Sequence, residues 1–160
     1  MKHSKSLLIV TSLFFVLAGA SACSKQEKPQ KKTEDANLIN VTMYENPNCK
    51  CCSKWVPYME EYGFSIKEVP SNNLTFINTQ YKVPGEMQSC HVALIDGYVI
   101  SGHVPADAIK KLLAERPHAK GLSVPGMQAG APGVAGDKDT PYNVYLFDGQ
   151  GHQSVYRSYP

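Results

Sequence analysis

In the ten residues Val92-Ala-Leu-Ile-Asp-Gly-Tyr-Val-Ile-Ser101, the pair Asp-Gly separates two runs of residues that favour β-strands. This arrangement predicts a β-hairpin with a two-residue turn. The turn also fixes the register, because Ile95 and Tyr98 must then face each other. Counting outward from this pair places Cys90 opposite His103. Directly opposed side chains have Cβ atoms about 5 Å apart, so the hairpin predicts that Cys90 and His103 can bind one ion.

Strands and helices alternate on both sides of this hairpin. Apolar residues at strand or helix spacing predict, in chain order, a strand over 40–44, a helix over 53–62, a strand over 64–69 and a helix over 74–81. A further helix is expected from Pro105 to Arg116, ended by Pro117. The resulting order, β-α-β-α-β-β-α, is that of the thioredoxin fold, so the sequence predicts an α/β, thioredoxin-like domain. Pro57 should kink the first helix unless it falls in the first turn.

The last quarter of the chain adds elements to that order. Residues 119–140 are rich in Gly, Pro and Ala and predict a long irregular loop. Residues 142–147 and 153–159 flank the turn Asp148-Gly-Gln-Gly151 and predict an added C-terminal β-hairpin.

Four of the five cysteines are placed where chemistry is expected. Three lie in the segment Asn48-Cys-Lys-Cys-Cys52, and Cys90 directly precedes His91. Thiolates beside imidazole suit Cu(I), Zn(II) or iron–sulfur centres. The first and third strands of a thioredoxin-like sheet are antiparallel neighbours, so the cysteine loop should lie beside Cys90. The sequence therefore brings six candidate metal ligands to one corner: Cys49, Cys51, Cys52, Cys90, His91 and His103.

Five of these six candidates also have an interpretation without metal. Cys49 and Cys52 could be a redox Cys-x-x-Cys pair at a helix N-terminus, where the helix dipole lowers a thiol pKa. Cys51 could be a buried spacer and Cys90 a core residue, and His91 could point away from the cysteines. An extra thiol inside a redox pair invites wrong disulfides, which favours the metal interpretation of Cys51.

Met127 is a seventh candidate, in the loop segment Val124-Pro-Gly-Met127. Its thioether is a soft ligand for Cu(I), although methionine more often fills gaps in packing. A ligand or lid and a packing role both remain open for Met127. His118 and His152 are expected to be exposed and to lie outside the site.

Residues 1–22 have the pattern of a secretory signal peptide, with a basic start, an apolar run and small residues before the cut. Cleavage could release a free protein, or Cys23 could carry a lipid as in a bacterial lipoprotein. Residues 23–37 are rich in Lys, Glu and Gln and predict a disordered tether, which favours lipid attachment. Either way the chain is expected in the periplasm or cell envelope, where thiols are oxidised unless they are kept reduced or metal-bound.

Residues 38–160 are enough for one domain with a modest core. The formal net charge is +2, but residues 1–37 hold six of the sixteen basic and three of the fourteen acidic residues. The domain itself is close to neutral and has no basic stripe, so nucleic acid is not an expected partner. Membrane contact is expected only through a lipid anchor at Cys23.

The chain resembles the CopG-like bacterial copper-resistance proteins in several motifs. The matching segments are Tyr44-Glu-Asn-Pro-Asn-Cys-Lys-Cys-Cys52, Ser89-Cys-His-Val-Ala93 and Gly97-Tyr-Val-Ile-Ser-Gly-His-Val-Pro-Ala106. The resemblance covers essentially residues 41–159. It implies an exported thioredoxin-like domain that binds copper through its cysteines and histidine in copper-tolerance systems. Val134 stands where a second methionine of the loop is expected in that family.

The donor chemistry favours a centre with more than one metal ion. Side chains of adjacent residues diverge, so Cys51 and Cys52 cannot easily point at one ion together with Cys49. Thiolate sulfur bridges soft ions readily, whereas four thiolates and two imidazoles exceed the four positions of zinc. We therefore expect a copper-binding protein holding several Cu(I) ions, able to exchange electrons with them, rather than a turnover enzyme. Expected partners are copper ions and efflux or storage proteins. The alternatives are a thiol–disulfide oxidoreductase using Cys49 and Cys52, and a structural zinc domain.

Overall fold

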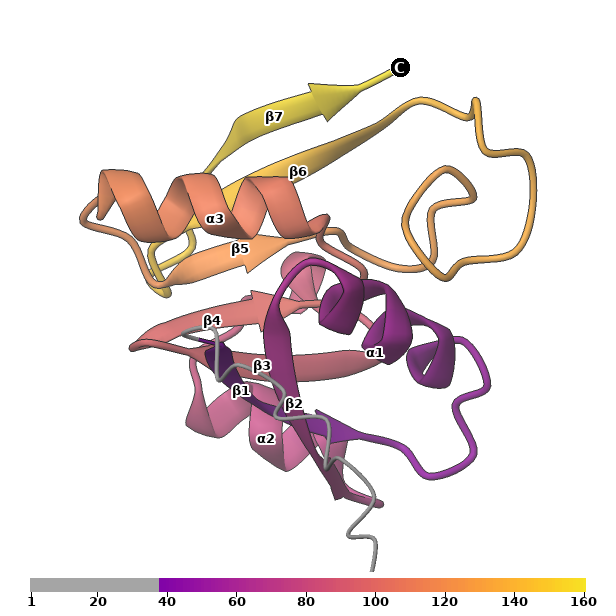
Figure 1. The fold of residues 1–160 in the computed structure, drawn as a ribbon. Helices are drawn as coiled ribbons and strands as arrows, with labels where there is room; N and C mark the ends of the chain where they lie inside the picture. The colour runs from indigo at the N-terminus through magenta and orange to yellow at the C-terminus, as the bar shows by residue number, and fades with distance from the viewer. Residues whose placement is uncertain (1–37) are drawn as a thin grey trace, which may run out of the picture. The chain divides into compact units, whose positions relative to one another are not determined.

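A seven-stranded mixed β-sheet forms the centre of the protein in a computed structural model that describes residues 38–160 (Figure 1). Its strands follow the order β2-β1-β3-β4-β5-β6-β7. The elements are β1 (Ile39–Glu45), α1 (Cys52–Glu61), β2 (Phe64–Pro70), α2 (Leu74–Gln80), the 3-10 turn η1 (Gly85–Met87), β3 (His91–Ile95), β4 (Tyr98–Ser101), α3 (Ala106–Glu115), β5 (Gly121–Ser123), β6 (Tyr142–Phe147) and β7 (Gln153–Tyr159). The predicted signal segment, Cys23 and the tether lie outside the described residues.

The predicted order of strands and helices is confirmed from β1 to α3. β1 pairs with β2 in parallel and with β3 in antiparallel orientation, and β3 pairs with β4 in antiparallel orientation. The hairpin register is also confirmed, since Ile95 faces Tyr98 and Val92 faces Ser101. Asp96 and Gly97 have φ values of 46° and 87°, which is the left-handed conformation that a type I′ turn requires at both positions. The pairing of β1 with β3 makes the first and third strands neighbours. This places the cysteine loop beside Cys90, as predicted.

The prediction of an irregular loop over residues 119–140 was wrong at its start. β5 lies there, parallel to β4 and antiparallel to β6. The predicted C-terminal hairpin is confirmed as β6 and β7, and β5 joins it to the main sheet. Gly121 permits the pairing, because a Cβ atom at this position would run into the backbone of Val99.

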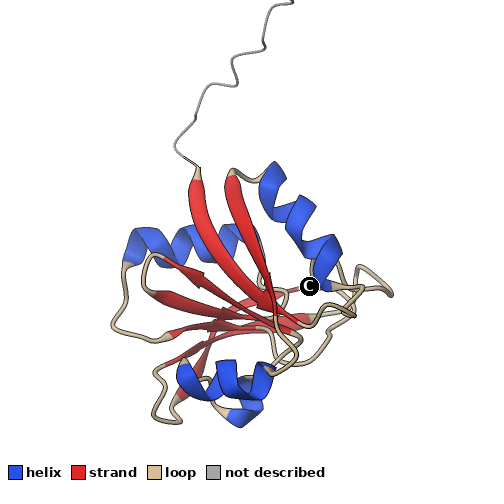
Figure 2. Ribbon diagram, turned by 90° about the horizontal axis from the view of Figure 1, so that it is seen from below, coloured by secondary structure: helices blue, strands red, loops and turns tan. Residues whose placement is uncertain are grey.

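Helices lie on both sides of the sheet and divide the core into two parts (Figure 2). α1 and α3 pack on one face, and the main cluster there includes Trp55, Met59, Ile109 and Leu112. A smaller cluster on the other face contains Ile77 of α2, with Val83, Met87, Val92, Val99 and Phe147. Within residues 38–160, no helix is both long enough and apolar enough to cross a membrane.

Helix α1 carries the cysteine loop into the core. Pro57 lies inside α1, beyond its first turn, so it removes one backbone hydrogen bond from the helix. Burial of Cys52, Trp55, Val56 and Met59 on one side offsets that loss by placing the helix firmly against the sheet.

Candidate metal centre

The cysteine loop connects β1 to the start of α1. Cys52 is the first residue of α1 and is fully buried, whereas Cys49 and Cys51 are half-buried. The backbone N–H of Cys49 donates to Asn46 O at 2.8 Å, and the N–H of Lys54 donates to Cys51 O at 3.0 Å. These bonds close the turn on both sides and hold three sulfur atoms at one end of α1.

Cys90 and the two histidines come from the β3–β4 hairpin. Cys90 directly precedes β3, and its Sγ lies 3.8 Å from Cys51 Sγ. The same sulfur lies 3.2 Å from His103 Nε2 and 3.5 Å from His91 Nδ1. The pairing of Cys90 with His103, predicted from the Asp-Gly turn, is therefore present.

The donor atoms form two groups that share members. In each group the ligand atoms lie within 4.8 Å of one another, and each group could hold a metal ion. One group is Cys49, Cys51, Cys52 and Cys90, and the other is Cys52, Cys90, His91 and His103. Cys52 and Cys90 belong to both, so the six residues form a continuous cluster of sulfur and nitrogen donors.

Two of the cysteines are joined to each other. A disulfide links Cys49 and Cys52, whose Cα atoms are 5.5 Å apart. Cys51 and Cys90 are the free cysteines of the described chain. The same four sulfurs can therefore exist either as one disulfide with two free thiols or, after reduction of the disulfide, as four thiols that can become thiolate ligands.

His103 is held so that one ring nitrogen faces the sulfur atoms. Its Nδ1 lies 2.7 Å from the carbonyl oxygen of Pro132. A carbonyl can only accept, so Nδ1 carries the proton and Nε2 keeps its lone pair toward Cys90. This is the arrangement by which metal-binding histidines are usually oriented. Burial lowers the pKa of His103, which keeps the ring neutral.

His91 is completely buried beside His103 and Trp55. The His91 ring centroid is 4.7 Å from that of Trp55 and 5.1 Å from that of His103. Burial, together with the neighbouring His103, lowers the pKa of His91 to about 3. Its Nε2 has no hydrogen-bond partner among the described residues, although a buried unpaired polar atom is costly. The ring is thus a neutral imidazole with a nitrogen lone pair available.

Cys90 is the most strongly perturbed thiol of the cluster. Burial and the adjacent Cys51 raise its pKa to about 12. The thiol therefore keeps its proton at neutral pH until a metal ion displaces it.

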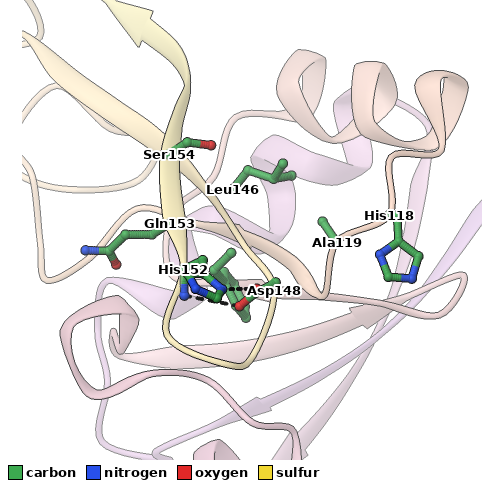
Figure 3. A pocket seen from close by; sticks show the side chains of 8 residues that line it. His118, Ala119, Leu146, Asp148, His152, Gln153 and Ser154 are labelled. Atoms are coloured by element: carbon green, nitrogen blue, oxygen red, sulfur yellow. Dashed lines mark hydrogen bonds and ion pairs between the residues drawn. The ribbon is translucent and has the colours of Figure 1, made fainter.

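Met127 lies at the outer edge of the cluster. Its Sδ is 3.5 Å from Cys51 Sγ, and the residue is 62% exposed. The thioether therefore extends the row of sulfur atoms to the surface. His118 and His152 line a different pocket and are exposed, as expected (Figure 3).

Several supporting groups were missed from the sequence. The Pro132 carbonyl orients His103, and Trp55 packs on His91 while its Nε1 donates to Val104 O at 3.0 Å. Gly102, with a φ of 74°, allows the chain to turn where a Cβ atom would strike Ser89. The Gly-His-Val-Pro motif is the one sequence signal that could have indicated a required glycine beside His103.

Together, the fold and this cluster define an α/β protein with a Cys/His site that could hold a metal ion. A family model described as "Protein of unknown function, DUF411" matches residues 87–134, which include Cys90, His91, His103 and Met127. A comparison with curated proteins finds no match.

Two solved structures, described as Form 1 and Form 2 of "Copper resistance protein copG", are 34% identical to the chain, with a TM-score of 0.72. The alignments cover 77% of this chain and 98–99% of those chains. The chain belongs to the CopG copper-resistance family, as its motifs indicated.

Proposed function

We propose that the protein binds Cu(I) in a cysteine-bridged site that holds more than one ion, as part of copper resistance. The observation that carries this proposal is the sharing of Cys52 and Cys90 between the two donor groups. A sulfur that belongs to two ligand sets is placed to bridge two soft ions. The likeness to structures described as copper resistance proteins supports copper as the metal.

The donor set favours Cu(I) over zinc. Thiolate, thioether and neutral imidazole are soft or borderline donors, and both imidazoles are kept neutral by burial. Zinc is normally complete with four ligands in a tetrahedral site, whereas this cluster offers four sulfurs and two imidazoles. A mixed sulfur–nitrogen environment also lets one site stabilise copper in both oxidation states, so exchange between Cu(I) and Cu(II) belongs to this proposal.

Transfer of copper would take place at the exposed edge formed by Cys51 and Met127. The thioether is neutral and needs no deprotonation, so it can receive an ion before the thiolates do. Efflux or storage proteins are the partners that such an edge would serve. The signal pattern of residues 1–22 and the position of Cys23 support a periplasmic or lipid-anchored location for this exchange.

Copper stoichiometry tests the proposal directly. Protein purified without oxygen from copper-supplemented cells should retain more than one copper per chain, measured by elemental analysis beside a thiol count. The cluster can supply enough donors for several ions only if sulfurs are shared. Tight binding of zinc, with copper held no better than by a chain lacking its cysteines, would contradict the proposal.

A second function, thiol–disulfide exchange, is favoured by one observation, the disulfide between Cys49 and Cys52 at the start of α1. In that reaction a substrate dithiol would give two electrons and two protons to the disulfide, leaving both cysteines as thiols. Neither Cys51 nor the histidines would be required.

The variant Cys51→Ser separates the two functions. It keeps Cys49 and Cys52, so an oxidoreductase should retain most of its disulfide-reducing rate. A copper cluster should lose ions or bind them at least about tenfold more weakly, because Cys51 joins Cys90 to Met127. Lys54→Ala is a matched control, since Lys54 is exposed on the first turn of α1 and has no sulfur. Full copper content in Cys51→Ser would contradict the proposed role of Cys51.

We expect His103→Ala to weaken Cu(I) binding by about tenfold or more, because it removes the imidazole nitrogen nearest Cys90. Competition with a Cu(I) chelator under reducing conditions measures the change. His118→Ala is the control, since this histidine lies outside the cluster. Equal Cu(I) affinity in wild type and His103→Ala would show that His103 only packs beside the site.

A further inference from the structure

A free thiol lies in contact with the disulfide of the cysteine loop. Cys51 Sγ is 3.1 Å from Cys49 Sγ, and Cys49 is bonded to Cys52. A disulfide exchanges its partners when a thiolate attacks one of its two sulfur atoms and releases the other. Cys51 therefore lies where its sulfur can attack Cys49 and release Cys52.

The burial of the three cysteines favours this direction of attack. Cys49 and Cys51 are half-buried, whereas Cys52 is fully buried at the start of α1. A thiol arriving from solvent cannot reach the Cys52 sulfur directly, but the Cys51 thiol already touches the other half of the disulfide. The loop holds it there, because the Ser53 hydroxyl donates to Lys50 O at 3.0 Å.

The sulfur that such an attack releases belongs to a complete donor group. The mixed sulfur–nitrogen group consists of Cys52, Cys90, His91 and His103, whose ligand atoms lie within 4.8 Å of one another. While Cys52 is bonded to Cys49, this group lacks one sulfur. Exchange restores it without electrons from outside, because one disulfide replaces another. Two thiolates and two imidazoles are then enough to bind one four-coordinate ion.

We propose that the oxidised chain binds one Cu(I) ion in the mixed sulfur–nitrogen group after Cys51 has replaced Cys52 in the disulfide. The Cys51 thiolate forms a bond to Cys49 Sγ, the bond between Cys49 and Cys52 breaks, and Cys52 leaves as a thiolate. The number of disulfides is unchanged, and the protons of Cys51 and Cys90 pass to solvent. Binding of the ion to the released thiolate draws the equilibrium toward the Cys49–Cys51 pair. This inference rests on the proposed Cu(I) function and extends it to the oxidised protein.

The experiment maps the disulfide before and after Cu(I) is added. The full chain with Cys23→Ser is oxidised until two thiols remain, and one equivalent of Cu(I) is added without oxygen or thiol reductant. Acid then protonates the thiols and stops exchange, and mass spectrometry of peptides cut at acid pH identifies the disulfide. We expect Cys49–Cys52 before copper and Cys49–Cys51 afterwards, with one copper per chain and an unchanged thiol count.

Two variants test the exchange itself. Oxidised Cys51→Ser has no attacking sulfur, so it should keep Cys49–Cys52 and bind Cu(I) at least about tenfold more weakly than oxidised wild type. Cys52→Ser should close Cys49–Cys51 on oxidation, because those two sulfurs already touch. Lys54→Ala is the control, since this exposed side chain has no sulfur, and its disulfide should move as in wild type.

Bound copper with the disulfide still between Cys49 and Cys52 would overturn the exchange, and so would wild-type affinity in oxidised Cys51→Ser. Reduced chain is titrated in parallel. If reduced chain binds copper and oxidised chain does not, this inference alone is wrong. If neither binds copper, the proposed function is wrong as well. Fluorescence from Trp55 before copper is added shows that each variant is folded.

Discussion

Cys90→Ser is expected to lose more than half of the copper that the wild-type chain retains and to hold the rest at least about tenfold more weakly. Cys90 belongs to both donor groups, and its sulfur lies within 4 Å of Cys51 Sγ, His91 Nδ1 and His103 Nε2. Serine keeps the size and the hydrogen-bonding capacity but removes the soft donor that joins the two groups.

Two further readouts distinguish loss of a ligand from loss of the fold. Trp55 is the only tryptophan of the chain and packs against His91, so copper loading should quench its fluorescence in wild type and less so in the variant. Burial raises the pKa of Cys90 to about 12, so this thiol is protonated near neutral pH before copper binds. On copper loading, the wild-type chain should therefore release one proton more than Cys90→Ser does.

Cys23→Ser makes the same chemical change outside the described residues and should leave copper content unchanged. Equal copper content and equal proton release in Cys90→Ser and wild type would contradict a central role for Cys90. Unfolding of the variant would show as a shifted Trp55 emission before any metal is added, which separates it from loss of a ligand.

The hairpin and the site around it could be predicted because both depend on local rules. Side chains alternate along a strand, so a two-residue turn at Asp96 and Gly97 fixes every opposed pair. That rule alone predicted Cys90 beside His103. The expected pairing of β1 with β3 then predicted that the cysteine loop lies beside Cys90. Helix α1 was equally readable from the spacing of its apolar residues.

The features that were missed depend on long-range contacts. β5 is three residues long, too short for alternation to show, and it forms only because β4 and β6 lie on either side. The Pro132 carbonyl that orients His103 is a backbone group, and any residue could supply it. The oxidation state of Cys49 and Cys52 also has no sequence signal. A disulfide and a metal site use the same two residues, and the disulfide is only the form oxidised by two electrons.

Copper binding is expected to depend strongly on whether the Cys49–Cys52 disulfide is reduced. Closing the Cys49–Cys52 disulfide removes two of the four sulfurs from one donor group and Cys52 from the other. Opening it takes two electrons and two protons and yields two thiols. We therefore expect oxidised protein to retain less than half of the copper held by reduced protein, because Cys51 and Cys90 are then the remaining thiol ligands.

The measurement loads reduced chain with copper without oxygen, compares it with chain oxidised before loading, and counts thiols in parallel. Cys49→Ser cannot form this disulfide, so its copper content, although lower than wild type, should respond much less to prior oxidation. Equal copper content in oxidised and reduced wild type would show that Cys51, Cys90 and the histidines hold the ions alone. That result would exclude Cys49 and Cys52 as ligands. If copper content instead decreases together with the thiol count, both cysteines are ligands. The redox state of Cys49 and Cys52 then determines how much copper the protein can bind.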